Sequence, residues 1–202
     1  MRHQEKDRSK IILGIDPGSI ACGFGVISAE IPKSGLLGDS PPHTDGFAEK
    51  NEARRAEGLK ARTCALNPAY IASGRIVLSS RRPLNTRLKE LYDALTDIIK
   101  EYSPDEVAVE KIFFAKSVKA ALTLGQARGA VLLAAASCGL PVYEYSALSV
   151  KKAIVGYGRA EKHQVQGMVS KMLNLKSKLS KDSADALAIA LCHTNTLRLG
   201  KL

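Results

Sequence analysis

The sequence predicts one α/β domain with a mixed five-stranded sheet flanked by helices. An early apolar run ends at Asp16-Pro-Gly and a second begins almost at once, which is typical of a buried strand, a turn and a second strand. A later apolar run, residues 106–110, follows a predicted helix, so its strand is expected to run parallel to the first. The 202 residues suffice for one domain, 1–202, with a sizeable core.

The first half of the chain predicts three strands and one helix. Residues 12–27 form the first two strands, and residues 70–78 form a third that completes a meander. Between them, residues 29–69 contain four prolines and no periodic pattern beyond a possible short helix at 49–60, so we expect a long insert of unknown role. A helix with an apolar stripe begins at Pro83 and ends near Ser103-Pro104.

The second half alternates strands and helices. A long helix at 116–137 carries Gly125 and Gly129 four residues apart, which permits close packing either on its own sheet or on its copy in a dimer. Residues 140–145 form the last strand, and Ser146 caps the next helix. Further helices are expected at 161–173 and from Asp182 onward.

Composition and charge exclude several classes of protein. With 45% hydrophobic and 25% charged residues the chain resembles a soluble globular protein, and we expect no apolar run to approach the roughly 20 residues of a membrane span. The polar start argues against export, and four scattered cysteines fit a reducing cytoplasm better than a zinc site or disulfide framework. Of the net charge of +10, residues 151–181 carry +7, from eight bases against Glu161 alone. Such a segment is either a polyanion-binding surface or a solvated face.

Four acids stand where elements begin or end. Asp16 follows the first strand and Glu110 the fourth, while Asp182 and Asp185 lie three apart, on one face of the last helix. Taken singly, Asp16 could merely start a turn, and the pair could merely cap its helix. Because sites in α/β sheets form beyond the carboxyl ends of neighbouring strands, we expect all four to converge.

Clustered carboxylates point to a hard divalent cation. The four acids would repel one another without a counter-charge, and all-oxygen ligands suit Mg²⁺ or Mn²⁺ rather than zinc. Two such ions could hold the attacking water and the leaving oxygen in phosphodiester hydrolysis, while the basic segment binds the polyanion.

Five motifs together resemble the RuvC-type Holliday junction resolvases, in the family's order and over most of residues 11–28 and 70–195. They are Ile-Leu-Gly-Ile-Asp16-Pro-Gly, Val-Ala-Val-Glu110-Lys-Ile-Phe113-Phe-Ala-Lys, Leu-Gly-Gln-Ala-Arg-Gly129, Val-Gly-Tyr-Gly-Arg-Ala-Glu-Lys162 and Asp182-Ser-Ala-Asp185-Ala-Leu-Ala-Ile-Ala. The chain departs from the family's pattern between residues 28 and 69, where the family has a short link.

The resemblance implies an RNase H-like fold and a homodimer packed through the long central helices. It also implies a metal-dependent endonuclease that resolves four-way DNA junctions by paired symmetric nicks in homologous recombination and DNA repair, with RuvA and RuvB as partners. The positions that match the family's catalytic and metal-binding acids are Asp16, Glu110, Asp182 and Asp185. Phe113 matches its base-stacking aromatic, and Lys151 and Lys162 match its phosphate-contacting lysines; core packing for the first and solvation for the lysines are the alternatives.

Three other functions compete with this interpretation. An actin-like or sugar-kinase ATPase uses a similar Asp-x-Gly turn, but it needs two such halves, and this chain has one. The RuvC-like nucleases of ribosomal RNA precursors share the Asp-Pro-Gly opening, but they are shorter and lack the Leu-Gly-Gln-Ala-Arg-Gly helix. A non-catalytic junction-binding protein would have no use for the four acids.

Overall fold

A computed structural model of the chain describes residues 8–18, 20–31, 68–111, 118–177 and 179–200. Five strands form one mixed sheet in the order β3-β2-β1-β4-β5. β1 (Arg8–Asp16) pairs antiparallel with β2 (Ala21–Ile31), which pairs antiparallel with β3 (Ala69–Val77). β4 (Glu106–Glu110) runs parallel to β1, and β5 (Val142–Tyr145) runs parallel to β4. The predicted fold class, strand count and parallel pairing are confirmed.

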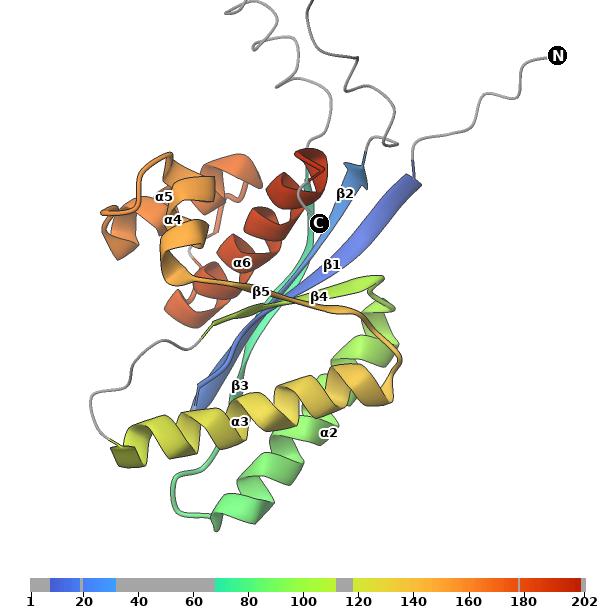
Figure 1. Cartoon of the computed structure of the whole chain (residues 1–202), viewed down its shortest axis with the longest axis vertical. Helices are drawn as coiled ribbons and strands as arrows, with labels where there is room; N and C mark the ends of the chain where they lie inside the picture. Colours follow the sequence, from blue (N-terminus) through green and yellow to red (C-terminus); the bar gives the residue numbers. More distant parts are fainter. Residues whose placement is uncertain (1–7, 19, 32–67, 112–117, 178, 201–202) are drawn as a thin grey trace, which may run out of the picture.

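Helices cover both faces of the sheet (Figure 1). α2 (Leu84–Tyr102) and α3 (Val118–Ser137) form one layer, and α4 (Ala147–Val155), α5 (Lys162–Met172) and α6 (Lys181–Arg198) form the other. The stripe of α2 is buried at Leu91, Leu95 and Ile99, as its spacing predicts. Each helical layer has its own apolar core against the sheet.

Several boundaries differ from the prediction. β2 continues to Ile31 and β3 begins at Ala69, so the strands occupy both margins of the insert expected at 29–69; the rest of it, with the possible helix at 49–60, lies outside the described residues. The last helix begins at Lys181 rather than Asp182, because Ser180 is its N-cap and its side chain accepts a hydrogen bond from the backbone N–H of Ser183. The alternative in which Asp182 and Asp185 cap this helix is therefore wrong.

The α6 backbone lies unusually close to β1 and β2 because glycines face it. A Cβ on Gly14 would lie 2.1 Å from the carbonyl oxygen of Ala186, and a Cβ on Gly23 would lie 2.1 Å from that of Asp182. Real Cβ atoms are not found at such distances from backbone oxygen, so these positions accept no side chain without a shift of the helix. The glycines thus bring the start of α6 close to the end of β1.

A buried polar chain also ties α6 to the sheet. Fully buried His193 bonds through Nε2 to Oε2 of Glu106 at 2.6 Å and through Nδ1 to the hydroxyl of Tyr145 at 2.6 Å. Lys10 donates to the other carboxylate oxygen of Glu106. Burial lowers the pKa of His193, so the ring is neutral, donates through Nε2 and accepts through Nδ1. One residue of α6 is thus bonded to both β4 and β5.

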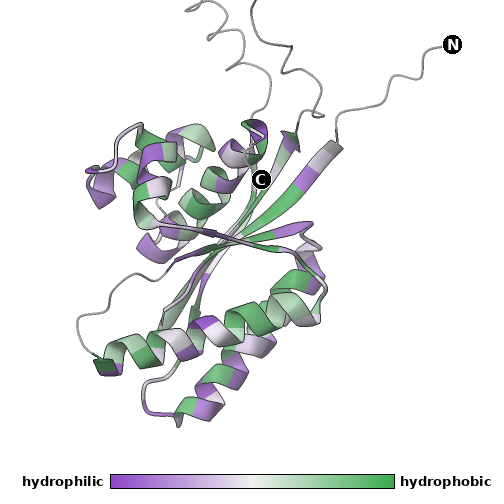
Figure 2. Ribbon diagram, in the orientation of Figure 1, coloured by the Kyte–Doolittle hydropathy of each residue, from purple (hydrophilic) through white to green (hydrophobic). Residues whose placement is uncertain are grey.

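The expectation that no apolar segment approaches the length of a membrane span needs one correction. α3 is long and apolar enough, by length and composition alone, to cross a bilayer, and it is the one such helix among the described residues. A single helix of this kind is weak evidence, because the core helix of a soluble protein passes the same test. Figure 2 shows hydrophobic residues along much of its length.

Candidate active site

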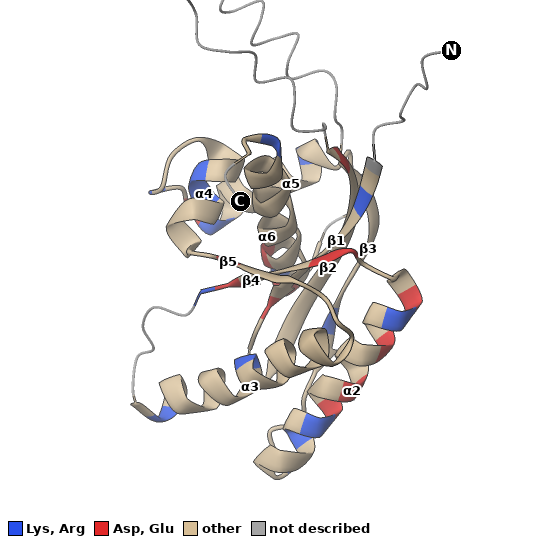
Figure 3. Ribbon diagram, turned by 45° about the vertical axis from the view of Figure 1, so that its right-hand side comes forward, with Lys and Arg blue, Asp and Glu red and all other residues tan. Residues whose placement is uncertain are grey.

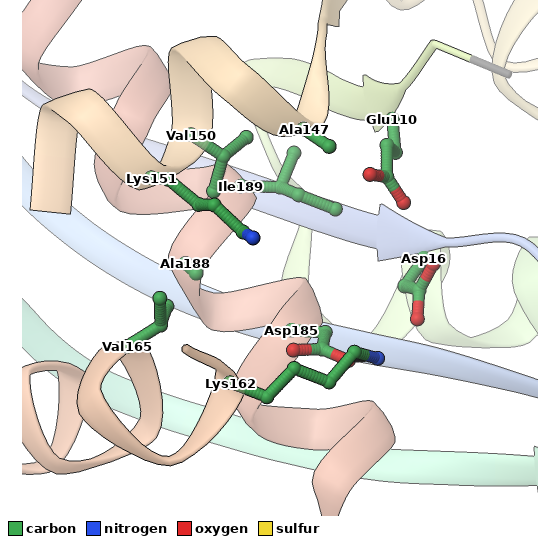
Figure 4. A pocket seen from close by; sticks show the side chains of 10 residues that line it. All are labelled: Asp16, Glu110, Ala147, Val150, Lys151, Lys162, Val165, Asp185, Ala188 and Ile189. Atoms are coloured by element: carbon green, nitrogen blue, oxygen red, sulfur yellow. Dashed lines mark hydrogen bonds and ion pairs between the residues drawn. The ribbon is translucent and has the colours of Figure 1, made fainter. Parts of the chain in front are cut away.

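Three of the four predicted acids line one pocket at the carboxyl ends of β1 and β4 (Figure 4). Asp16 is the last residue of β1, Glu110 is the last residue of β4, and Asp185 lies in the second turn of α6. The cavity has a volume of about 160 Å³. The parallel strands β1 and β4 thus bring together Asp16 and Glu110, which are 94 positions apart in the sequence. Their positions at strand ends predict this.

The fourth acid, Asp182, lies beside this pocket rather than in its lining. It stands in the first turn of α6, where the helix dipole favours a negative charge. Its Oδ2 lies 3.5 Å from Nη1 of Arg75, which comes from β3. The convergence expected of four acids is therefore tight for three of them and looser for Asp182.

The expected lysines both reach the pocket from the second helical layer. Lys162, the first residue of α5, places Nζ 3.3 Å from Oδ2 of Asp185. Lys151 lines the pocket from α4, and its amine points toward the same opening in Figure 4. Val150, Val165 and Ile189 form an apolar floor behind the charged groups. Lys152, next to Lys151 in the sequence, is exposed, and Figure 3 shows basic residues on α4.

The acids strongly perturb one another. Burial, followed by repulsion from Glu110 and Asp185, raises the pKa of Asp16 to about 7, and Lys162 only partly opposes this rise. Burial and Asp185 likewise raise the pKa of Glu110. The Asp185 carboxylate in turn raises the pKa of Lys162 above its ordinary value. The pocket therefore holds more negative charge than its lysines neutralise, and a cation would relieve the excess.

The chemistry of this donor set fits Mg²⁺ or Mn²⁺. Its candidate ligands are carboxylate oxygens, which hard divalent cations prefer. Within the described ranges, no three His, Cys, Asp or Glu side chains already stand in a metal-holding arrangement, and Lys162 lies against Asp185 instead. A divalent ion bound here would take over the charge-compensating role of that amine.

Comparison with known proteins decides the family. The profile of the family described as "Crossover junction endodeoxyribonuclease RuvC" matches residues 60–193. A protein of that name from Saccharophagus degradans is 44% identical over 186 residues, which cover 92% of this chain and 88% of the relative. The chain belongs to the RuvC family. It is therefore a nuclease of the hydrolase class, from a family of metal-dependent enzymes.

Other RuvC proteins extend the match to nearly the whole chain. The crossover junction endodeoxyribonuclease RuvC of Citrifermentans bemidjiense is 40% identical over 192 residues, 95% of this chain and 96% of the relative. The solved structure "T. thermophilus RuvC in complex with Holliday junction substrate" is 30% identical, with a TM-score of 0.73 and coverage of 95% of this chain and 96% of that one. The RNase H-like fold is thus confirmed, and these matches favour neither the ATPase nor the ribosomal RNA nuclease alternative.

Some residues at the RuvC-type site were not predicted from the sequence, and one predicted residue lies outside the described residues. Phe113 lies outside the described residues, so its predicted stacking role stays a prediction. Arg75 was not predicted as a site residue, because nothing in a strand pattern marks one arginine as a neighbour of an acid from a distant helix. The role of Gly14 and Gly23 in the close approach of α6 was not predicted either. A signal was available, because Gly14 lies two residues before Asp16 and Gly23 lies opposite Asp16 in the predicted hairpin.

Proposed function

We propose that this protein resolves four-way DNA junctions by paired symmetric nicks, in homologous recombination and DNA repair. The observation that carries the proposal is the pocket where Asp16, Glu110 and Asp185 face two lysines. The relative with the Holliday junction substrate supports the same substrate for this chain, at 30% identity over nearly its whole length.

We propose that Asp16, Glu110, Asp182 and Asp185 hold the metal, Mg²⁺ or Mn²⁺ and two ions per site. When bound, such ions supply positive charge to the attacking water and to the leaving oxygen of the phosphodiester. Asp182 stands close enough to Asp185, one turn along α6, to join the site by side-chain rotation. The raised pKa values of Asp16 and Glu110 support this assignment, since burial and then repulsion from neighbouring carboxylates raise them, and a bound cation would offset both effects.

The lysines act on the DNA backbone. Lys151 and Lys162 project from α4 and α5 toward the acids, so a phosphate held by them would lie against the carboxylates. In the hydrolysis the water oxygen bonds to phosphorus as the bond from phosphorus to the bridging oxygen breaks, and that oxygen takes a proton. The cut strand then carries one phosphate end and one hydroxyl end.

We propose further that the enzyme acts as a homodimer packed through α3. The glycine side of this helix does not pack on its own sheet: a Cβ on Gly125 or Gly129 would meet nothing within 4 Å. Leu122 and Leu133 on the same helix are 63% and 59% exposed, and an adjoining groove of about 350 Å³ lies between α2 and α3. A second copy that covers this apolar face would give two active sites for the two strands of one junction.

We propose the cellular setting by analogy with the family. RuvA and RuvB, which drive branch migration, are the proposed partners. A cytoplasmic location is supported by the free thiols of the described cysteines Cys22, Cys138 and Cys192. We propose a single nuclease domain over residues 1–202. The insert predicted at about 29–69 is bounded by β2, which ends at Ile31, and by β3, which begins at Ala69, and its role is unknown.

The function is tested by giving the purified protein a synthetic four-way junction, a duplex of the same sequence and an RNA–DNA hybrid, with and without Mg²⁺. We expect efficient cleavage of the junction alone, symmetric across its two arms and dependent on the metal. Equal cleavage of the duplex, or cleavage confined to the hybrid, would contradict the proposal.

A further inference from the structure

Arg75 lies in the same row of the sheet as Asp16. In the strand register Asp16 pairs with Gly23, and Gly23 pairs with Arg75. Residues directly opposite one another on antiparallel strands project to the same face of a sheet. Gly23 faces α6, because a Cβ there would strike the backbone of Asp182. Arg75 therefore projects to the α6 face, on the β3 side of the acids.

The guanidinium of Arg75 is only partly engaged. Nη1 lies 3.5 Å from Oδ2 of Asp182, which is long for a charge-assisted hydrogen bond. The side chain is 51% exposed, against 32% for that of Asp182. Within the part of the chain that the structure describes, Asp182 is the one acid paired with Arg75. A guanidinium has five N–H donors, so one loose pair leaves donors on the solvent side.

The cations around the pocket lie on two flanks of the acids, and the free N–H donors of Arg75 belong to one of them. Lys151 and Lys162 approach the acids from α4, which directly follows β5, and from α5. Arg75 approaches from the opposite flank, on the edge strand β3. A DNA strand that crosses the acids carries a phosphate at every nucleotide, so it meets a cation on each flank. The planar fork of arginine can bond a carboxylate through one nitrogen and a phosphate through another.

We infer that Arg75 is a phosphate-contacting residue on the β3 flank of the active site, where it binds the backbone of the strand to be cut. The inference rests on the proposed function and adds a contact to it. The competing explanation is that Arg75 only holds Asp182 in place.

The test compares Arg75→Gln with Arg82→Gln. Arg82 is a matched control, because it is also an exposed arginine, 59% exposed, in an ion pair with an acid, Glu90, on α2. Binding of a four-way junction is measured in EDTA over a range of salt concentrations, so that neither metal nor cleavage contributes. We expect Arg75→Gln to bind about 3- to 10-fold more weakly, with a log–log salt slope smaller by about one, and Arg82→Gln to match wild type. Equal behaviour of the two variants would overturn the inference.

A second background separates direct contact from support of Asp182. With Asp182→Asn present, Arg75→Gln should still weaken binding by a similar factor, since the phosphate contact remains to be lost. If the effect vanishes there, Arg75 acts only through Asp182 and the inference is wrong. The wild-type protein tests the proposed function independently, because a lack of preference for the junction over a duplex would refute that function. In that case, comparing Arg75→Gln with Arg82→Gln on the duplex would still decide whether Arg75 contacts a DNA backbone.

Discussion

Nζ of Lys162 lies 3.3 Å from Oδ2 of Asp185, so the first residue of α5 neutralises an acid in the second turn of α6. The lysine side chain is 76% exposed, so this contact contributes little to stability. The contact matters because of where it places the Lys162 amine. The amine stands among carboxylates that lack counter-charge, and it can turn outward to a phosphate once a metal ion takes its place.

Replacing Lys162 should therefore affect DNA binding more than the stability of the fold. We expect Lys162→Met to weaken junction binding in EDTA about 3- to 10-fold, to lower the log–log salt slope by about one and to leave the unfolding midpoint nearly unchanged. Lys100→Met is the control, because Lys100 is an exposed lysine in the last turn of α2 and does not line the pocket. An unchanged salt slope for Lys162→Met would show that this lysine is merely solvated.

The contact of Gly23 with α6 predicts a coupled loss of stability and cleavage. In Gly23→Ala the new Cβ would stand 2.1 Å from the carbonyl oxygen of Asp182, so the start of α6 must move. We expect a cost of about 1–3 kcal/mol in the free energy of unfolding, typical of overpacking, and a large drop in junction cleavage.

Gly167→Ala is the matched control for that experiment. A Cβ at this position of α5 meets nothing within 4 Å, so the substitution should raise stability by roughly 0.5–1 kcal/mol through helix propensity. Wild-type stability and cleavage in Gly23→Ala would disprove the close approach of α6 to β2.

The His193 chain predicts a pH dependence of stability. Burial lowers the pKa of His193 in the folded protein, so the unfolded chain takes up a proton first as the pH falls through about 6.5. Stability from this group is complete above that pH and is lost below it, at up to about 1.4 kcal/mol per pH unit. Burial alone would raise the pKa of Glu106, but the bonds from Lys10 and His193 lower it, so its contribution is lost only below pH 4.5.

Urea unfolding between pH 7.5 and 5 in EDTA measures this effect. Because Asp16 titrates in both wild type and His193→Gln, the difference between these two proteins isolates the effect of His193. This difference in the free energy of unfolding should shrink as the pH falls. His163→Gln, at an exposed position of α5, should keep the wild-type profile. A constant difference between wild type and His193→Gln would mean that His193 is not neutral in the fold.

The exposed apolar face of α3 predicts the oligomeric state. We expect a dimer in sedimentation experiments and its dissociation in Leu133→Asp, because Leu133 is 59% exposed beside the groove between α2 and α3. Leu199→Asp introduces the same charge at a leucine that is 58% exposed outside this face, and it should remain dimeric. A monomeric wild-type protein would refute the proposed interface.

The strand ends and helix stripes were predictable because they depend on local sequence. Asp16 and Glu110 each close an apolar run, and parallel strands place such residues at one edge of the sheet. The start of α6 was misplaced by one residue because Ser180 competes for the N-cap with acids that look equally suitable. The Arg75–Asp182 pair could not be foreseen, since it depends on the register between β2 and β3 across a 37-residue connection.

Amide substitution of the two strand-end acids tests the central claim most directly. Asp16→Asn and Glu110→Gln keep shape but remove the charge that a metal ion requires, whereas Asp93→Asn makes the same change on the remote helix α2. Cleavage of a four-way junction in Mg²⁺ should fall by at least about 100-fold in the first two variants and stay at the wild-type rate in the third, with junction binding in EDTA retained by all. Wild-type cleavage by either Asp16→Asn or Glu110→Gln would contradict the account.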